Sequence, residues 1–123
     1  IRARLVAHDG YGLSELETAG GPVYLPRLSS ALGAELRLRI PAQDVMIALA
    51  RPTGISALNI LAVTVETVTP EGGSGVVLRL AMGQDRMLAR LTRRSVETLD
   101  LRPGMAVFAV LKSVALAQGE TGV

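Results

Sequence analysis

The chain alternates apolar and polar residues over several short stretches, which is the period of a strand with one buried face. The clearest case is 34–40, where Leu, Leu and Ile alternate with Glu, Arg and Arg. Similar patterns predict further strands over 1–8, 13–18, 23–25, 45–50, 61–68, 76–81, 87–91, 105–111 and 114–117. Turn residues such as Gly, Pro and Asp separate these stretches, so we expect an all-β chain.

Two short segments have helical spacing instead. In 26–32 three aliphatic side chains recur at the spacing of one helix face, and in 93–99 two lie three residues apart. Gly33 would end the first helix and the Pro103-Gly104 pair the second. The sequence therefore predicts one or two helical turns in each segment.

The second half of the chain repeats the order of the first. Residues 33–40 align with 104–111, and a break and a short apolar strand follow in each case, at 45–47 and 114–116. An internal duplication is therefore expected. Each half then has about five short strands, with a helical turn between the third and the fourth.

That content is typical of a small five-stranded Greek-key barrel of the OB type, and barrel closure protects the edges of short strands. We predict two OB-like barrels, one over 1–50 and one over 61–118. Residues 51–60 would form a hinge and anion-binding turn between them, and 119–123 a frayed tail.

The hinge itself is the best candidate for a binding site. Pro52 fixes φ and Gly54 permits a positive φ, so the chain must turn here. Ser56 and Asn59 then place a hydroxyl and an amide beside several backbone N–H groups, an arrangement that can hold an anion. The alternative is that Ser56 only caps a single helical turn that ends at Asn59.

Composition narrows the classes of protein. At 123 residues the chain can bury roughly two-thirds of its unfolded surface. It has no cysteine, which excludes a disulfide framework and a thiolate metal site. No apolar run approaches the length of about twenty residues that crosses a bilayer, so we expect no direct membrane insertion. Because the first residue is Ile1, we expect a portion of a longer chain.

The charge pattern gives little support to nucleic acid as a partner. The net charge is +2, and the basic residues are spread along the chain in ones and twos. Arg86, Arg90, Arg93 and Arg94 could follow a phosphate backbone, but single-stranded binding by OB folds also requires aromatic faces for base stacking. The only aromatic residues are Tyr11, Tyr24 and Phe108.

No catalytic constellation is present, so the chain is predicted to be non-enzymatic. The one lysine, Lys112, does not lie in a Gly-rich phosphate-binding loop. His8 is the only histidine and has no nucleophile motif beside it, so it is interpreted as a turn residue. Glu15 and Glu17 fit solvated carboxylates better than metal ligands.

Three sequence features resemble a known family. They are Ile-Pro-Ala-Gln-Asp-Val at 40–45, Ile-Ser-Ala-Leu-Asn at 55–59, and the late Lys112-Ser113 pair before a short Val-Ala-Leu strand. Together they resemble the molybdate-binding Mop and TOBE modules, above all the C-terminal accessory domain of the ATP-binding subunit of bacterial molybdate ABC transporters. The likeness covers essentially the whole chain, although 1–32 matches by pattern more than by motif.

The resemblance implies a biological setting. Such a domain follows a nucleotide-binding domain, forms OB-like barrels and pairs with its counterpart as a homodimer. It would work in the cytoplasm at the inner face of the plasma membrane, with the transporter's membrane subunits as partners. It requires no cofactor, and some members bind molybdate or tungstate between subunits to regulate transport.

The resemblance also implies a set of oxyanion-binding residues. Stand-alone molybdate-binding members have Thr-Ser-Ala-Arg-Asn, together with a late Lys-Ser segment. In this chain Ile55 replaces the Thr and Leu58 replaces the Arg, while the backbone N–H groups of the motif are retained. The candidate set is Ser56, Ala57, Leu58, Asn59, Lys112 and Ser113.

Two functional hypotheses follow. The first is a regulatory and dimerisation domain of a molybdate or tungstate importer's ATPase, which also binds the oxyanion. The alternative is a ligand-free structural interaction module of another ABC-transporter ATPase, such as that of a sugar importer. For pairing we expect an exposed apolar strand face at 105–111.

Overall fold

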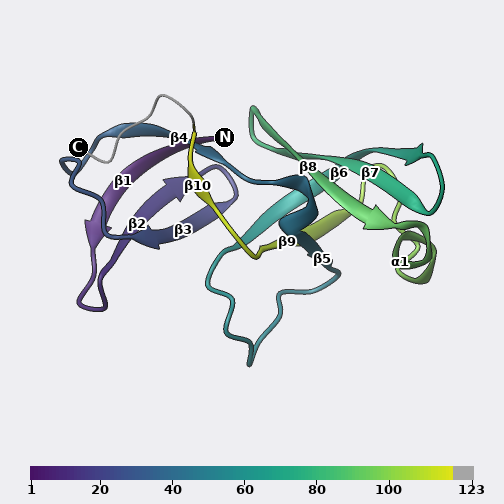
Figure 1. The fold of residues 1–123 in the computed structure, drawn as a ribbon, viewed down its shortest axis with the longest axis horizontal. Helices are drawn as coiled ribbons and strands as arrows, with labels where there is room; N and C mark the ends of the chain where they lie inside the picture. The colour runs from purple at the N-terminus through teal and green to yellow at the C-terminus, as the bar shows by residue number, and fades with distance from the viewer. Residues whose placement is uncertain (118–123) are drawn as a thin grey trace.

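Two five-stranded antiparallel sheets make up the protein, for which the computed structural model describes residues 1–117 (Figure 1). The first sheet has the order β10–β4–β1–β2–β3, formed by Ala115–Leu116, Glu35–Arg39, Arg2–His8, Leu13–Thr18 and Gly21–Pro26. The second has the order β5–β9–β6–β7–β8, formed by Val45–Ala48, Ala106–Leu111, Ile60–Glu71, Gly75–Met82 and Asp85–Thr92. The predicted all-β class with two five-stranded units is confirmed. The predicted tail at 119–123 lies outside the described residues.

The two halves of the chain exchange their last strands. β5 follows β4 in sequence but pairs with β9 in the second sheet, with Val45 opposite Leu111. In return β10, at the end of the second half, pairs with β4 in the first sheet, with Ala115 opposite Arg39. Each sheet therefore takes one strand from the other half, and the ranges 1–50 and 61–118 do not coincide with the sheets.

The duplication is visible in matching hydrogen bonds. In the first half the Gly33 N–H donates to the Leu5 carbonyl at 2.7 Å, and the Leu5 N–H donates to the Ala34 carbonyl at 2.9 Å. The second half has the same pair of bonds. The Gly104 N–H donates to the Val65 carbonyl at 2.7 Å, and the Val65 N–H donates to the Met105 carbonyl at 2.9 Å. Both glycines have positive φ, +89° and +93°, a conformation that favours glycine. The sequence alignment of 33–40 with 104–111 thus matches the backbone.

The helical predictions have different outcomes. The helix expected at 93–99 is present as α1 (Arg93–Thr98), where the Thr92 hydroxyl caps the helix by accepting the Ser95 N–H. The helix expected at 26–32 is absent, so that prediction is wrong. There the N–H groups of Arg27 and Leu28 donate instead to the Gly12 carbonyl and to the Ser14 hydroxyl. These bonds tie the start of the segment to the β1–β2 turn and to β2.

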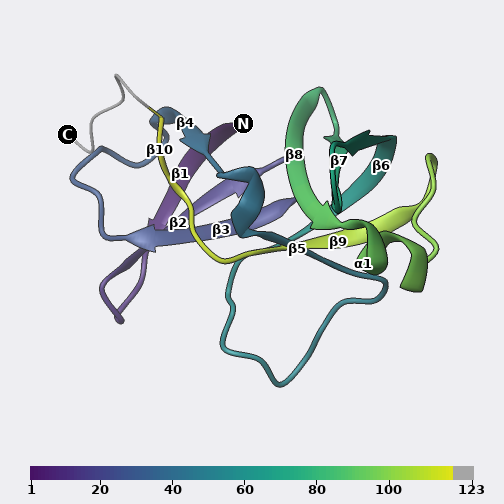
Figure 2. The same ribbon diagram turned by 45° about the vertical axis from the view of Figure 1, so that its right-hand side comes forward.

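Aliphatic side chains from both sheets form one core. Its fully buried members are mostly leucines and valines, namely Leu5, Leu16, Val23, Leu61, Val65, Leu78 and Leu80. The expected exposed face at 105–111 is wrong, because β9 lies between β5 and β6 and its Val107, Ala109 and Leu111 are buried. The second sheet also curls until β8 lies against β5 and the 3₁₀ turn η1 (Ala42–Asp44), which gives it a barrel-like form (Figure 2).

A tight contact at the β2–β3 turn joins the two sheets. The Gly20 carbonyl accepts the Ala62 N–H of β6 at 2.9 Å. A Cβ atom on Gly20 would lie 2.8 Å from the Met82 sulfur and 3.1 Å from the Ala62 carbonyl oxygen. The sulfur can move, but the carbonyl belongs to a paired strand, so the turn has no room for a methyl group.

We therefore predict that Gly20→Ala lowers the free energy of unfolding by about 1–3 kcal/mol, the usual cost of overpacking a core. Urea denaturation of the two chains measures the difference. The matched control is Gly10→Ala, because nothing lies within 4 Å of the Cβ that this change adds. Equal stability of Gly20→Ala and Gly10→Ala would contradict the close junction.

Candidate functional site

The loop 49–59 joins β5 to β6 and protrudes from the body of the protein in both views (Figures 1 and 2). Near its start the Arg51 guanidinium lies 5.1 Å from the centre of the Phe108 ring, within the range of a cation–π contact. At its tip Gly54 has a φ of +68°, as the sequence predicts for a turn. The loop is thus held at its base, while its central residues face solvent.

Asn59 holds the other end of the loop. Its side-chain oxygen accepts the Tyr24 N–H at 2.7 Å, and its amide nitrogen donates to the Tyr24 carbonyl at 3.1 Å. The amide therefore pairs with β3 as a neighbouring strand would. Both side-chain polar groups of Asn59 thus have backbone partners on β3, so Asn59 positions the loop.

The side chain of Tyr24 adds no charge to this junction. Burial raises the pKa of its phenol, and the nearby Glu15 carboxylate raises the pKa further. The phenol therefore stays neutral at physiological pH. Tyr24 therefore contributes backbone hydrogen bonds and no charge to this junction.

Ser56, Ala57 and Leu58 form the open part of the loop. Ser56 and Leu58 are exposed, and Ala57 is half-buried. Within residues 1–117 none of the three donates a backbone hydrogen bond, and no helical turn forms there. The alternative in which Ser56 caps a turn ending at Asn59 is therefore wrong. A hydroxyl and adjacent N–H groups remain available to a ligand.

The second candidate segment, Lys112 and Ser113, directly follows β9. The Lys112 N–H donates to the Asp44 carbonyl at 2.8 Å, and the Ser113 hydroxyl donates to the Asp44 carboxylate at 2.6 Å. Both residues are exposed, and the Lys112 ammonium forms no salt bridge with the part of the chain that the structure describes. Ser113 is therefore already engaged, whereas Lys112 is open.

The two candidate segments lie at the same end of the second sheet. The Leu111 N–H donates to the Asn59 carbonyl at 2.8 Å, so the end of β9 lies beside the residue that closes the loop. β5 starts on the other side of β9 and brings Asp44 there. Asp44 is the residue that sequence reasoning missed, because only the strand exchange places it next to Ser113.

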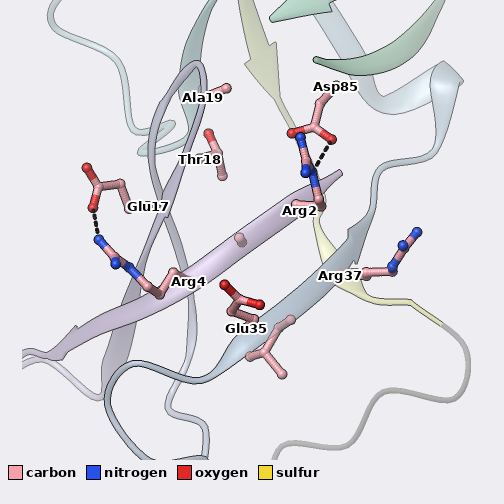
Figure 3. Close-up of a pocket in the computed structure, with 10 residues that line it drawn as sticks. Arg2, Arg4, Glu17, Thr18, Ala19, Glu35, Arg37 and Asp85 are labelled. Atoms are coloured by element: carbon pink, nitrogen blue, oxygen red, sulfur yellow. Dashed lines mark hydrogen bonds and ion pairs between the residues drawn. The ribbon is translucent and has the colours of Figure 1, made fainter. Parts of the chain in front are cut away.

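A separate hollow of about 550 Å³ lies where β1 meets the turn between β7 and β8 (Figure 3). Two ion pairs cross it, Arg2 with Asp85 at 3.2 Å and Arg4 with Glu17 at 3.3 Å. Its remaining charged residues are Glu35 and Arg37, so three positive charges meet three negative ones. This balance gives the hollow no preference for anions.

His8 has a partner that the sequence did not predict. Its Nδ1 lies 2.8 Å from the Ser14 hydroxyl, the same hydroxyl that accepts the Leu28 N–H. Ser14 is completely buried, which prevents a substrate from reaching it. The pair therefore holds the loop after β3 in place.

Residues 1–117 contain no group of three His, Cys, Asp or Glu side chains placed to hold a metal ion. No helix in the same range has the length and apolar character needed to cross a membrane.

Comparisons with known proteins agree on one family. A model of the TOBE domain matches residues 55–118, more than half of the chain. The chain is 42% identical to the molybdenum import ATP-binding protein ModC of Mesorhizobium japonicum over 123 residues, covering 99% of this chain and 33% of that protein. It is 43% identical to the protein of the same name from Rhizobium etli over 104 residues, which covers 85% of this chain and 29% of that protein. The chain thus spans about a third of these curated relatives.

One solved structure has the same fold over nearly its whole length. It is the cytoplasmic molybdate-binding protein ModG with molybdate bound, at a TM-score of 0.73 and 26% sequence identity. The superposition covers 94% of this chain and 92% of that one.

The geometry predicts different effects of two substitutions in the loop. Asn59→Ala leaves the Tyr24 N–H and carbonyl without partners, so it should lower the free energy of unfolding by about 1–3 kcal/mol. Ser56→Ala removes no hydrogen bond and should stay within about 0.5 kcal/mol of the parent chain. Chemical denaturation distinguishes them, and a fully stable Asn59→Ala variant would be inconsistent with a positioning role for Asn59.

Proposed function

Since the chain belongs to the TOBE domain family, we propose that it is the regulatory and dimerisation domain of the ATP-binding subunit of a molybdate or tungstate importer, and that it binds the oxyanion. The observation that carries the proposal is the bond between the Leu111 N–H and the Asn59 carbonyl at 2.8 Å. It supports the proposal because Asn59 ends the motif in the loop and Leu111 directly precedes the Lys112-Ser113 pair.

Four groups in these two segments suit a tetrahedral dianion. They are the Ser56 hydroxyl, the backbone N–H groups of Ala57 and Leu58, and the Lys112 ammonium, and all of them are donors that other described residues leave open. An anion that leaves water requires such donors to compensate its lost hydration. A lysine supplies a compact point charge, which does not require the planar geometry of arginine.

The departures from the motif act against strong binding. Ile55 and Leu58 are about half exposed, 48% and 58%, and supply neither the hydroxyl nor the cation of the stand-alone proteins. We therefore expect weaker binding here than in a site with both groups, which suits a sensor that responds only when the oxyanion is abundant.

The proposed setting follows from the relatives. Their name describes an ATP-binding protein of molybdenum import, so the parent nucleotide-binding domain and the importer's membrane subunits are the proposed partners, at the cytoplasmic face of the membrane. The domain itself would have no catalytic role. If it binds no oxyanion, the alternative of a ligand-free interaction module, as in a sugar importer's ATPase, takes its place.

The first prediction concerns ligand binding. Molybdate at about 100 times its dissociation constant should stabilise the chain by about 2.7 kcal/mol and raise the melting temperature by roughly 10 °C, because only the folded state binds it. Lys112→Ala should abolish this rise but leave the unliganded melting temperature unchanged, since the ammonium forms no ion pair within 1–117. Thermal unfolding with and without ligand measures both.

Leu58→Arg is the complementary variant. It restores the family's cation at an exposed position and should lower the dissociation constant several-fold, as titration calorimetry would record. The absence of both a melting shift and calorimetric heat with millimolar molybdate and tungstate would remove the ligand-binding role.

A further prediction concerns pairing. Met46, Leu49, Ile55 and Leu58 are exposed on β5 and the loop, and such a group of apolar side chains marks an interaction surface. The chain should dimerise at about 50 µM, and Leu49→Glu combined with Ile55→Glu should weaken the dimer. Leu88→Glu, at an equally exposed leucine on β8, is the control. Light scattering that records a monomer for the parent chain would refute pairing.

A further inference from the structure

We infer that the Asp44 carboxylate is an internal competitor of the proposed oxyanion: it occupies the Ser113 hydroxyl and sets both the affinity and the charge preference of the site. The inference rests on the proposed function, because it concerns the same site. It identifies a residue that determines specificity and that the candidate oxyanion-binding set does not include.

The backbone holds Asp44 firmly beside the site. Asp44 is the last residue of η1, and its N–H donates to the Pro41 carbonyl at 3.0 Å. Its own carbonyl accepts the Lys112 N–H at 2.8 Å. With bonds on both sides, the carboxylate lies next to the 112–113 segment as a consequence of the fold.

The contact with Ser113 uses the one proton that the hydroxyl can donate. The distance from the Ser113 oxygen to the Asp44 carboxylate is 2.6 Å, in the range of a strong bond between a hydroxyl and an anion. The Ser113 oxygen then has only lone pairs left to present to a ligand. An oxyanion can therefore receive a bond from Ser113 only after the Asp44 contact breaks.

The charge of Asp44 acts in the same direction. Its carboxylate forms no salt bridge with Lys112 or with any other residue of 1–117. An anion beside Ser113 would meet this charge, and at about 4 Å in a watery environment the repulsion amounts to roughly fivefold in affinity for each unit of ligand charge. A dianion is therefore penalised more than a monoanion of the same shape.

The contact also links the site to the strand exchange. Asp44 immediately precedes β5, the strand that the first half gives to the second sheet, whereas Ser113 precedes β10, the strand given in return. An oxyanion that accepts the hydrogen bond of the Ser113 hydroxyl would replace Asp44 as its acceptor. This would break a bond between the two exchanged segments. Occupancy of the site is thereby coupled to the contact between the halves.

The test is Asp44→Asn, measured by titration calorimetry. Molybdate, a dianion, should bind at least about tenfold more tightly, since the repulsion is removed and a neutral amide oxygen competes less strongly than a carboxylate for the Ser113 hydroxyl. Perrhenate, a tetrahedral monoanion, should gain clearly less. Asp44→Ser is a second variant without the charge, and melting temperatures in the absence of ligand establish that each variant is folded.

Asp100→Asn is the matched control. It makes the same change of charge beside Arg102, just after α1 and before the start of β9, whereas Ser113 follows the end of β9. Asp100 has a φ of +52°, which asparagine also tolerates. Its affinity for molybdate should stay within about twofold of the parent value.

Ser113→Ala completes a double-mutant cycle. In the parent chain it should change the affinity for molybdate by less than about twofold, because the Ser113 hydroxyl already donates to Asp44. In the Asp44→Asn background it should lower the affinity several-fold.

If the parent chain binds molybdate and Asp44→Asn binds no better, the inference is wrong and the proposed function stands. Binding by Asp44→Asn alone would support the inference and refute oxyanion sensing by the natural chain. If neither binds at millimolar concentration, both are wrong.

Discussion

The reciprocal exchange of β5 and β10 is the constraint on which the rest of the structure depends. Each strand leaves the half that precedes it in sequence and completes the sheet of the other, opposite β9 and β4. The buried Val45 of β5 thereby enters the core of the second sheet. Neither half has a complete sheet alone, so the duplicated units must fold together. The junctions at Gly20 and Asn59 then fix the orientation of the sheets.

The candidate site is a product of this exchange. β9 lies between β6 and β5 and is antiparallel to both. The end of β9 therefore lies beside the residues that precede β6 and β5. The residues concerned are Asn59, Asp44 and the 112–113 segment, which are far apart in the sequence. Asn59 and Arg51 hold the loop, and the donors of 56–58 remain exposed. Rigid anchors with an open centre suit a ligand that only the folded chain binds.

The sequence was sufficient for the elements and their repetition. Alternation located most strands, and the pairing of Gly33 with Gly104 in the alignment reflects two turns with the same positive φ. The motif also identified two segments whose ends lie side by side, at Asn59 and Leu111. The strand exchange escaped prediction because alternation shows which face of a strand is buried but not which neighbour it pairs with.

The errors have a shared cause in tertiary hydrogen bonds. The spacing in 26–32 fits a helix, but Gly12 and Ser14 supply acceptors for its N–H groups. The spacing around Asn59 likewise does not reveal the bonds of its side chain to the Tyr24 backbone. The apolar run at 105–111 was expected to have an exposed face because β5 was assigned to the first unit. In the structure β5 pairs with β9 in the second sheet. The contact of Asp44 with Ser113 could not be found for the same reason.

The central claim is that the loop and the segment after β9 form one oxyanion site at the end of the second sheet. Amide NMR spectra of the nitrogen-15-labelled chain, titrated with molybdate, test it most directly, because each backbone N–H reports on its own surroundings. The account predicts saturable shifts at Ala57, Leu58, Lys112 and Ser113, with little change at Gly10 in the distant β1–β2 turn. Spectra that do not change, or shifts confined to the Arg2, Arg4 and Arg37 hollow, would contradict it.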